Sequence, residues 1–487
     1  MRIIDLIDKE QIVSSDISLS YKVETIEHNA KNCNENSLFI LPNSKKCPKE
    51  FKKEPAAVVC DERAELPKGI RSIRIKDARQ VTARIYARFY GIHKTALKLI
   101  GVTGTNGKTS TASFLKQAYS NAGEKVGFIG TGLISIGNTV VSEQYYSMTT
   151  PDPWLLYPTL SKMEESGCSV VIMEISSHAL ELRKVEPLIF DVGIFTNLSP
   201  EHLDFHGDEE SYYQAKKKLF SQCRTAVINI DDPHGRRLVR ETECEKITAG
   251  ILWRGDVYVS DIKSYGFDGI EYLYHGKSYS FAMKLRTAGI YNVYNSMLAI
   301  AAATHLGLKP CRVKQALSTL PTINGRYEII KDEITVIIDY AHTDTALENV
   351  LKNLVEAKEK RQKLTVIFGC GGERDRSKRA RMAKAAERYA DFTVVTSDNS
   401  RGEDPDTIIS DIVKGFDTLS YKIIKDRKIA IIDTLLSLDT GDIVAIIGKG
   451  AEKYNIDRGG YHSFDEKAIV SEVLKLRKEK KDNENKA

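Results

Sequence analysis

A glycine-rich segment between an apolar run and a helical pattern carries the clearest chemistry in the sequence. Leu97–Val102 has the character of a buried strand, and a helical pattern opens at the lysine that follows the glycines. Glycines let backbone N–H groups approach phosphate oxygens, and a helix N-terminus favours negative charge. The lysine can contact the β- and γ-phosphates, and the threonine hydroxyl can bind Mg²⁺. The segment predicts a nucleoside triphosphate site formed by Gly104, Thr105, Asn106, Gly107, Lys108, Thr109 and Ser110.

The glycine spacing departs from the strict phosphate-loop pattern G-x-x-x-x-G-K-[ST]. Val102 stands where that pattern has its first glycine, and the glycine is displaced to Gly104. A glycine-rich turn that binds no ligand is therefore an alternative. The strand before the segment and the helix after it favour the phosphate site.

Two of three further features downstream have the residue types of a metal site. Glu174 ends the apolar run Val170–Glu174, where P-loop enzymes place a second contact to Mg²⁺. An ordinary acidic residue at a strand end is the alternative. A triple lysine, residues 216–218, would by itself fit a solvated helix face. After the next strand come three side chains that could bind a metal, His202, Asp204 and His206. At most one of them is expected to do so, because single histidines are more often structural.

Composition limits the class of protein. A chain of 487 residues is too long for one core, so roughly two to four domains are expected. The formal net charge of +5 is small for this length and gives no argument for nucleic acid or an anionic membrane surface. The 8 cysteines are scattered without a C-x-x-C pair, which favours reduced thiols over disulfides or zinc. Residues 1–10 lack the features of a signal peptide, and no apolar run could span a bilayer, so a cytoplasmic protein is expected.

The elements that must position these residues alternate between strand and helix. Residues 1 to about 95 have short strands at 37–41 and 56–60 and a helical pattern over 78–89. From Lys98 to about Pro321 the alternation is typical of doubly wound α/β folds. The expected strands here are 126–130, 168–174, 192–196 and 226–229, followed by antiparallel strands over 256–285 and a helix over 292–303. From Gly325 a second, smaller α/β block has strands at 334–338, 364–368, 392–396 and 443–447, and the tail 476–487 is expected to be a fraying helix end.

Taken together, the motifs resemble those of the Mur ligase family of peptidoglycan synthesis, and within it the members that add a diamino acid. The resemblance covers most of the chain from Lys98 to Ile469. It rests on ordered motifs that include Gly104-Thr-Asn-Gly-Lys-Thr109, Thr149-Thr-Pro-Asp152, Ser176-Ser-His-Ala-Leu180, Ala215-Lys-x-x-Leu-Phe220, Asn292-Val-Tyr-Asn295, Gly325-Arg-Tyr-Glu328, Asp339-Tyr-Ala-His-Thr343, Asp398-Asn-Ser-Arg401 and Gly448-Lys-Gly-Ala-Glu452.

The resemblance implies an α/β protein of three domains. These are a small UDP-sugar-binding domain (residues 1–96), a central ATP-binding domain with a P-loop-type parallel sheet (97–323) and a Rossmann-like amino-acid-binding domain (324–475), followed by the charged tail (476–487). The implied reaction is ATP-dependent amide formation with Mg²⁺ as cofactor. ATP phosphorylates a substrate carboxylate, and an amine then attacks the acyl phosphate.

The family pattern also implies roles for individual residues. Lys108, Glu174, His202 and Lys216 would be catalytic, with Thr109 and Glu174 on one Mg²⁺ and His202 on a second. Lys216 matches the carbamylated lysine (N6-carboxylysine) of the family, whose negative charge would stabilise the second metal. ATP would contact Asn295, Arg326 and Asp339, and the acceptor would contact Thr149, Thr150, Ser176, Ser177 and Lys184.

The stretch Asp398-Asn-Ser-Arg401 resembles the Asp-Asn-Pro-Arg motif of diaminopimelate-adding members, with Ser400 in place of proline, and the resemblance implies contact with the distal end of the amine substrate. An arginine there can bind a second carboxylate through two parallel hydrogen bonds. This favours meso-diaminopimelate, with L-lysine as second choice. The alternative is that Arg401 only pairs with Glu403 or Asp404 at the surface. The amino-acid contacts implied by the resemblance are Arg374, Asp398, Asn399, Arg401, Gly448 and Glu452.

The first domain departs most from the family. Asn29-Ala-Lys31 stands where Asp-Ser-Arg is usual, and the following segment, residues 45–53, is shortened and lysine-rich. The leading hypothesis is ligation to UDP-MurNAc-L-Ala-D-Glu, with a Mur ligase paralogue acting on another carboxylate acceptor, in a peptide or cofactor pathway, as the alternative. A nucleotide-binding regulatory protein that has lost ligation is disfavoured, because the four catalytic residues remain. The expected partners are small-molecule substrates, without nucleic acid or membrane insertion, and a monomer is the default expectation.

Overall fold

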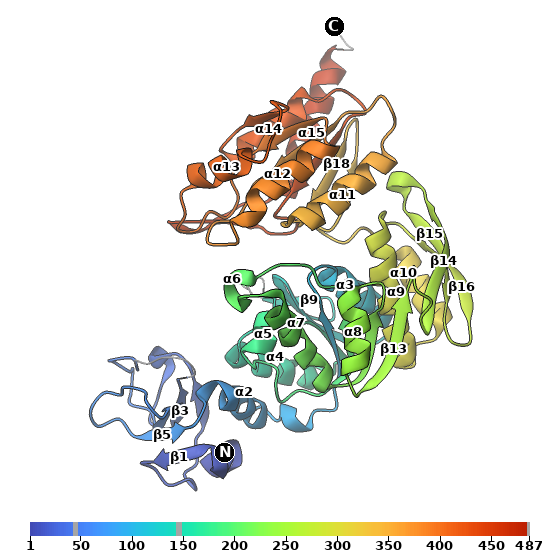
Figure 1. Cartoon of the computed structure of the whole chain (residues 1–487). Coiled ribbons are helices and arrows are strands. Elements are labelled where there is room, and N and C mark those ends of the chain that lie inside the picture. The colour runs from blue at the N-terminus through green and yellow to red at the C-terminus, as the bar shows by residue number, and fades with distance from the viewer. Residues whose placement is uncertain (42–46, 143–148, 485–487) are drawn as a thin grey trace. The chain divides into compact units, whose positions relative to one another are not determined.

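The computed structural model describes residues 1–41, 47–142 and 149–484 (Figure 1). The chain forms two compact units. The first comprises Met1–Gly104, Tyr119–Thr196 and Tyr213–Thr248, and the second comprises Thr105–Ala118, Asn197–Tyr212 and Ala249–Ala487.

The N-terminal part of the first unit is a five-stranded sheet with the order β1-β5-β4-β3-β2. Its strands are β1 (Ile12–Ser15), β2 (Thr25–Glu27), β3 (Ser37–Ile40), β4 (Ala57–Asp61) and β5 (Ser72–Ile75), and α2 (Ala78–Phe89) follows them. Asp77 caps α2 by accepting hydrogen bonds from the backbone N–H groups of Arg79 and Gln80. The two strands and the helix expected here are confirmed. In the lysine-rich segment 45–53, Lys45 and Lys46 lie outside the described residues. Lys53 pairs with Glu35 at 3.2 Å.

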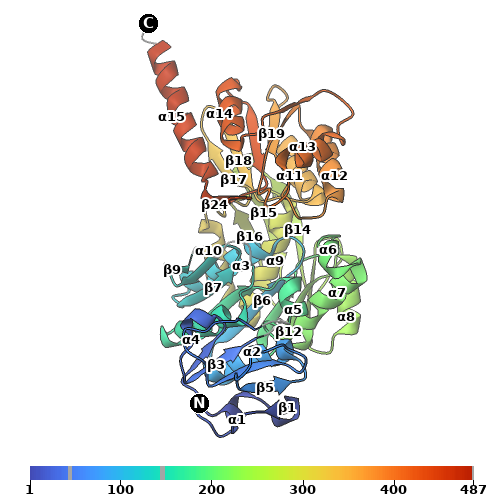
Figure 2. The same ribbon diagram turned by 90° about the vertical axis from the view of Figure 1, so that its left-hand side faces the viewer.

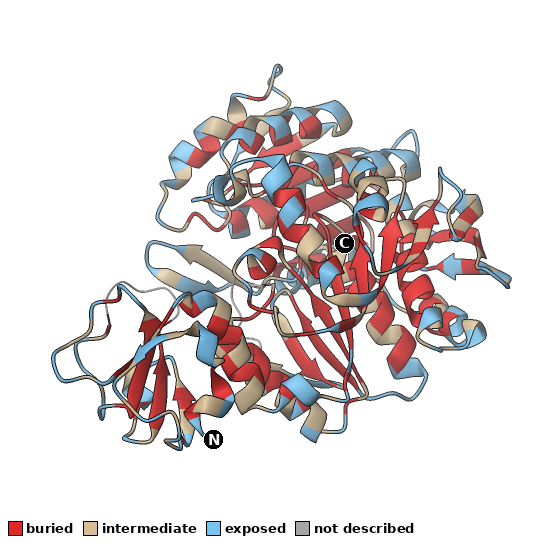
Figure 3. Ribbon diagram, turned by 60° about the horizontal axis from the view of Figure 1, so that its bottom comes forward, coloured by how far each residue is buried: buried red, intermediate tan, exposed pale blue. Residues whose placement is uncertain are grey.

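The rest of the first unit is built on a mostly parallel sheet. Its order is β12-β11-β6-β10-β7-β8-β9, with β8 and β9 antiparallel to their neighbours. The strands are β6 (Lys98–Thr103), β7 (Val126–Gly130), β8 (Leu133–Ile136), β9 (Thr139–Ser142), β10 (Val170–Glu174), β11 (Phe190–Phe195) and β12 (Cys223–Asn229). Every residue of β7 and β10 is buried, as expected of parallel strands covered on both faces (Figure 3). The helices of this region are α4 (Pro153–Glu165), α5 (Ser177–Glu181), α7 (Glu209–Lys217) and α8 (Pro233–Glu241).

The second unit contains the antiparallel strands predicted from the sequence. The strand β13 (Glu245–Gly250) pairs in parallel with β14 (Val257–Ser264), and β15 (Ile270–His275) and β16 (Ser280–Leu285) continue in antiparallel order. The helices α9 (Ile290–His305) and α10 (Pro310–Thr319) follow, and α3 (Lys108–Asn121) begins in this unit. The predicted helix over 292–303 is thus confirmed and is longer at both ends.

Residues from 325 onward form a six-stranded sheet with the order β17-β18-β22-β19-β20-β21. The strands are β17 (Glu328–Lys331), β18 (Thr335–Asp339), β19 (Leu364–Phe368), β20 (Phe392–Val395), β21 (Tyr421–Ile423) and β22 (Ile443–Ile447). Only the pairing of β17 with β18 is antiparallel among these described strands. This is the second α/β block predicted from the sequence.

Helices cover both faces of this sheet (Figure 2). One apolar core packs α11 (Asp344–Ala357), α12 (Ser377–Tyr389) and α13 (Pro405–Val413) against one face. A second core packs α14 (Arg427–Ser437) and α15 (Glu466–Glu484) against the other face. This doubly wound arrangement places the loops after β19 and β20 at the carboxyl ends of neighbouring strands, where such folds bind ligands.

A hairpin and a tight backbone crossing complete the second block. The hairpin pairs β23 (Tyr454–Asp457) with β24 (Gly460–Ser463). At the crossing, a Cβ added to Gly325 would lie 2.1 Å from the nitrogen of Ala451, and one added to Gly450 would lie 2.5 Å from the oxygen of Gly325. Both positions therefore require glycine.

Three further predictions from the sequence concern the membrane, the cysteines and the C-terminal tail. Among the described residues, no helix is both long and apolar enough to cross a bilayer. All the cysteines, which fall within the described ranges, are free thiols. The charged tail continues α15 as far as Glu484, in agreement with the predicted helix end.

Candidate functional site

The predicted phosphate loop is fastened to the segment that follows β11. The backbone nitrogen of Thr105 donates to the oxygen of Asn197 at 2.9 Å. The side chain of Asn197 accepts from the nitrogen of Asn106 at 3.0 Å and donates to the oxygen of Asn106 at 3.1 Å. Thr105 Oγ1 donates to the oxygen of Ser199 at 3.2 Å. These bonds hold the loop in place within the second unit.

Asn295, a predicted nucleotide contact on α9, lies against the same loop. Gly107 has φ +85°, and a Cβ at this position would come within 2.3 Å of Asn295 Oδ1. Thr111, one turn into α3, donates from Oγ1 to Asn295 Oδ1 at 3.4 Å. Glycine at residue 107 therefore serves both the left-handed backbone and this close approach.

Cationic side chains gather at the start of α3. Lys108, the first residue of the helix, donates from Nζ to the oxygen of Thr105 at 2.8 Å. Arg326 donates from Nη2 to Thr109 Oγ1 at 3.0 Å. The structure thus brings Lys108, Thr109 and Arg326 together. Two cations at a helix N-terminus form a suitable environment for an anion such as a polyphosphate.

Asp339 at the end of β18 anchors the backbone on either side of it. Its carboxylate accepts from the nitrogen of Tyr327 at 2.6 Å and from that of Ala341 at 2.7 Å. Burial raises the pKa of Asp339, against the opposing charge of Arg326. Asp339 therefore shapes the backbone next to Arg326 and contributes negative charge close to it.

An acid–histidine pair that sequence reasoning missed lies near the loop. His342 Nε2 lies 2.8 Å from Glu201 Oε1, and His202 Nε2 lies 3.8 Å from Glu201 Oε2. Burial alone would raise the pKa of Glu201, but the hydrogen bond from His342 and the charges of His342, His202 and Lys108 hold it well below its usual value. His342 belongs to a motif already singled out in the sequence, which was the available signal.

The predicted metal residues of this segment differ in their surroundings. His202 has a left-handed backbone with φ +57°, while the ring of His206 packs on Tyr212 with centroids 5.1 Å apart. Among the described residues, no group of three or more His, Cys, Asp or Glu side chains is arranged to hold a metal ion. Mg²⁺ does not require such a group, because it retains waters and binds one or two carboxylates together with substrate phosphates.

Glu174 organises the predicted acceptor residues of the first unit. This fully buried carboxylate accepts from the nitrogen of Thr131 at 3.1 Å and from its hydroxyl at 3.2 Å. Thr131 Oγ1 lies 3.2 Å from Thr149 Oγ1, and Thr150 Oγ1 donates to the oxygen of Glu174 at 2.8 Å. The nitrogen of Ser176 donates to Thr150 Oγ1 at 3.0 Å. The structure therefore brings Glu174, Thr149, Thr150 and Ser176 together.

Other predicted residues of the first unit lie on the neighbouring helices. Lys184 Nζ pairs with Asp152 at 2.7 Å, and Ser177 begins α5. Lys216 on α7 is buried, with 2% of its surface exposed, so it is not part of a solvated helix face. The ring of His28 stacks on Trp154 with centroids 4.6 Å apart.

The predicted amino-acid residues of the second unit lie on two loops that are bonded to each other. The nitrogen of Gly372 donates to the oxygen of Asn399 at 2.9 Å. Arg401 donates from Nη1 to the oxygen of Gly372 at 2.9 Å and to that of Asn399 at 3.2 Å. Burial and the nearby charge of Arg374 lower the pKa of Arg401. The neighbouring positive charges of Arg374 and Arg401 favour an anionic ligand such as a carboxylate.

A buried lysine holds the acidic and amide groups of the same region. Lys449, which is fully buried, donates from Nζ to Asn399 Oδ1 at 2.8 Å and lies 3.4 Å from Asp398. Asn399 donates from Nδ2 to Glu452 Oε2 at 2.9 Å. A Cβ on Gly448 would lie 2.7 Å from Asp398 Oδ2, so the backbone approaches this carboxylate closely. Lys449 was missed, although it lies inside the quoted Gly448-Lys-Gly-Ala-Glu452 motif.

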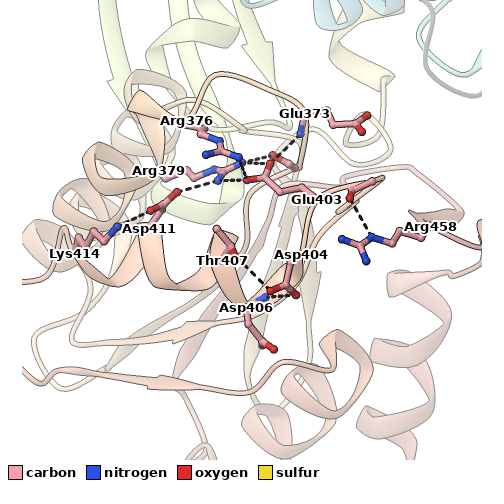
Figure 4. Close-up of polar contacts among 12 residues, drawn as sticks. Glu373, Arg376, Arg379, Glu403, Asp404, Asp406, Thr407, Asp411, Lys414 and Arg458 are labelled. Carbon is pink, nitrogen blue, oxygen red and sulfur yellow. Dashed lines mark hydrogen bonds and ion pairs between the residues drawn. The ribbon is translucent and has the colours of Figure 1, made fainter.

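Figure 4 shows how the loops after β19 and β20 are joined through Glu403. Its carboxylate accepts from Arg379 Nη1 at 2.8 Å and Nη2 at 2.7 Å, and from the nitrogen of Glu373 at 3.1 Å. Arg376 Nη2 lies 2.8 Å from Glu403 Oε1. The alternative pairing of Arg401 with Glu403 is therefore not what the structure shows, because Arg376 and Arg379 bind this carboxylate.

Comparisons with known proteins place the chain in a family. Residues 102–303 match the family model described as "Mur ligase middle domain", and residues 325–450 match "Mur ligase, glutamate ligase domain". The UDP-N-acetylmuramoyl-L-alanyl-D-glutamate--2,6-diaminopimelate ligase of Clostridioides difficile (strain 630) is 36% identical, over 97% of this chain and 99% of that protein.

Solved structures agree with these matches. A structure titled as a UDP-N-acetylmuramoyl-L-alanyl-D-glutamate--2,6-diaminopimelate ligase has a TM-score of 0.66 and 27% identity, with 98% of this chain and 99% of that chain covered. The MurF ligase of Thermotoga maritima, solved in complex with ADP, has a TM-score of 0.60 at 16% identity and covers 96% of this chain and 99% of its own, which shows a shared fold. The chain therefore belongs to the Mur ligase family.

Proposed function

We propose that the chain is an ATP-dependent ligase that adds a diamino acid to UDP-MurNAc-L-Ala-D-Glu through an acyl phosphate, in peptidoglycan precursor synthesis. Meso-diaminopimelate is the first choice for the amine and L-lysine the second. The observation that carries the proposal is the pair of bonded loops that hold Arg374, Asn399 and Arg401 near one another. Relatives that match nearly the whole chain bear the name of this activity.

On the nucleotide side, Lys108 and Arg326 balance the charge of the transferred phosphoryl group, and Asn295 contacts the base. Glu174 and the hydroxyl of Thr109 supply oxygen donors of the kind that Mg²⁺ binds. Mg²⁺, when bound, neutralises charge on the phosphates. His202 and a carbamylated Lys216 are proposed for a second ion, because a carbamate is an anion that can bind a metal, and Lys216 is buried rather than part of a solvated helix face.

On the acceptor side, Thr149, Thr150, Ser176, Ser177 and Lys184 contact the substrate whose carboxylate becomes the acyl phosphate. The hydrogen bonds among Thr150, Ser176 and Glu174 support a shared role for this group. Exclusion of water from the acyl phosphate is needed, since hydrolysis would waste ATP.

On the amine side, Arg401 and Arg374 bind the distal carboxylate of diaminopimelate. Asp398, Asn399 and Glu452, together with the backbone at Gly448, receive its ammonium group. The oxygen-rich character of this second set, next to the two arginines, suits a zwitterionic end group. L-Lysine would lack the carboxylate partner of the arginines.

The proposed domains are residues 1–96 for the UDP-sugar, 97–323 for ATP and 324–475 for the amino acid, with the tail 476–487. The enzyme is proposed to act in the cytoplasm as a monomer on small-molecule substrates. A Mur ligase paralogue with another acceptor is the second candidate. The observation that favours it is the departure at residues 29–31, where the family has Asp-Ser-Arg to bind the UDP-sugar. Here the side chain of Asn29 accepts a hydrogen bond from the nitrogen of Lys31 at 3.0 Å.

Phosphate release by the purified chain tests the proposal. ATP, Mg²⁺ and UDP-MurNAc-L-Ala-D-Glu are combined with meso-diaminopimelate, L-lysine or neither. We expect release only with acceptor and amine together, and faster with diaminopimelate. A chain that binds ATP and releases no phosphate with any amine contradicts the ligase. Release that requires a different carboxylate acceptor supports the paralogue instead.

A further inference from the structure

Two cysteines outside the predicted site lie side by side in the first unit. Cys223 is the first residue of β12, and Cys244 directly precedes β13. Their sulfur atoms are 3.8 Å apart, and both side chains are partly exposed to solvent. The other cysteines differ from this pair: Cys311 is exposed, and Cys33, Cys47, Cys60, Cys168 and Cys370 are buried.

The surrounding sheet holds the two thiols in place. Cys223 Sγ lies 3.8 Å from the oxygen of Phe220. It would be 3.1 Å from a Cβ on Gly193 in β11, so glycine at that position leaves room for the sulfur. Thr225 Oγ1 donates to Glu245 Oε2 at 3.2 Å and so ties together the same two segments next to the cysteines. The proximity of the thiols is therefore set by strand packing.

The two thiols have complementary acid–base character. Cys223 donates its S–H to the sulfur of Cys244, and this hydrogen bond, with the charge of Lys246, lowers the pKa of Cys244. The same hydrogen bond and burial raise the pKa of Cys223. A thiolate is the reactive form of cysteine, so Cys244 is the attacking sulfur and Cys223 the partner that resolves the product. By contrast, burial raises the pKa of Cys168.

We propose that Cys223 and Cys244 are a modification site, which a peroxide converts into a reversible disulfide within the chain. The thiolate of Cys244 attacks one peroxide oxygen, the O–O bond breaks, and Cys244 becomes a sulfenic acid. Cys223 then attacks the Cys244 sulfur, the S–O bond breaks, and hydroxide leaves with the Cys223 proton as water. For hydrogen peroxide, two thiols lose two electrons and two protons, and two waters form. The sulfurs must approach by about 1.8 Å to reach the length of a disulfide bond.

The pair lies away from the predicted acceptor residues of the same unit. Cys223 is opposite Phe190 at the amino end of the parallel pair β11 and β12. Glu174 is at the carboxyl end of β10, which runs parallel to β6 in the same sheet. The disulfide would therefore lie at the edge of the sheet that is formed by the amino ends of the parallel strands. The inference does not depend on the proposed function.

Peroxide treatment of the full-length chain tests the site. The native protein receives one equivalent of hydrogen peroxide, the chain is then denatured so that all remaining thiols are alkylated, and the peptides are mapped by mass spectrometry. We expect the alkylated thiols to fall from eight to six, a mass loss of two hydrogens before alkylation, and one peptide linking Cys223 to Cys244. Dithiothreitol should restore all eight. The proposal is overturned if both thiols remain alkylatable, or if the link joins other cysteines or two chains.

Variants in which one of the two cysteines is replaced by serine separate the two roles. Cys223→Ser should leave a sulfenic acid on Cys244 that dimedone traps, whereas Cys244→Ser should leave Cys223 unmodified. Cys311→Ser is the matched control, because it removes an exposed thiol outside the pair and should retain the link. Equal dimedone labelling of both serine variants would overturn the assigned roles. The peptide map of the unmutated chain remains decisive if either variant does not fold.

Discussion

Arg379 donates one hydrogen bond to each carboxylate oxygen of Glu403, at 2.8 and 2.7 Å, and its own side chain is fully buried. Glu403 also accepts from the backbone of Glu373, in the loop that carries Arg374. Because Glu403 itself follows Arg401, this ion pair fixes the two arginines of the proposed amino-acid site relative to each other. Arg379 and Glu403 are thus positioning residues.

Replacing this carboxylate should affect the amine substrate selectively. Glu403→Gln retains the size of the side chain but leaves Arg379 buried without its full countercharge. We expect the KM for diaminopimelate to rise by about tenfold or more, since small displacements of binding groups are costly, while the KM for ATP changes little. Steady-state kinetics with each substrate varied in turn measure this. Glu348→Gln, which removes the surface pair with Arg388, is the control and should leave both values unchanged.

The same residue gives a pH dependence of stability. The hydrogen bonds from Arg379 outweigh burial and lower the pKa of Glu403 to about 2. A carboxyl whose pKa is lowered by folding stabilises the native state above its unfolded pKa, roughly 4.3, and loses that contribution as pH falls toward the folded value. The difference in free energy of unfolding between wild type and Glu403→Gln should therefore be full at pH 6 and shrink at acidic pH. Urea titrations at several pH values measure it, and a constant difference would contradict the assignment.

Adjacent lysines on α7 provide a matched pair for the proposed carbamate. Lys216→Ala should abolish ligation, and added formate or acetate should restore part of it by supplying a carboxylate. Lys217→Ala removes only a partly exposed pair with Glu241 and should remain active. Phosphate release measures both, and a carbon-13 signal from labelled bicarbonate would report the carbamate. Normal turnover of Lys216→Ala would exclude the proposed role.

Arg401 should determine the preference between the two diamino acids. A hydrogen bond to a charged group contributes about 1.5–3 kcal/mol, so Arg401→Ala should lower kcat/KM for diaminopimelate by roughly 10- to 100-fold. ATP affinity should stay the same, and activity with L-lysine should fall less. Arg401→Lys keeps the charge but loses the planar fork, and should be intermediate. Parallel losses for ATP and the amine would indicate a general structural defect instead.

Two glycines at the ends of one segment distinguish backbone strain from steric conflict. Both Gly107 and Gly123 have a left-handed backbone, with φ of +85° and +89°, but only Gly107 faces a neighbour, Asn295. Gly107→Ala should therefore abolish ATP binding in isothermal titration. Gly123→Ala should cost about 1 kcal/mol of stability and bind ATP normally. Similar ATP affinities for the two variants would argue against a nucleotide role for the Gly107–Asn295 contact.

The sequence predicted those elements that have a long apolar run or a strong local boundary. β6 and α3 were predictable because two glycines, Gly104 and Gly107, separate an apolar strand from a helical pattern. β17 and β21 were not, since they are short, partly exposed edge strands whose existence depends on partners far along the chain. Strand pairing at sheet edges is a tertiary property that local patterns do not record.

The side chains of the site divide in the same way. Sequence motifs identified Lys108 and Asn399 as candidate site residues, but they did not predict which groups these side chains contact. The alternative that Arg401 only pairs with the nearby Glu403 came from sequence proximity, whereas in the folded chain Glu403 pairs with Arg379, 24 residues away. Likewise Glu201 and His342 meet across 141 residues. Which charges pair is decided by how segments far apart in the chain fold against one another.

The crossing of Gly325 and Gly450 limits how related genes can diverge. Any side chain at either position would push apart two backbones that nothing flexible separates, so no compensating change in a neighbouring side chain could accommodate it. Alanine at one of these codons should therefore be as damaging as loss of a reacting group, even though neither glycine touches a substrate. In a survey of variants, this pair should tolerate fewer substitutions than most of the apolar core.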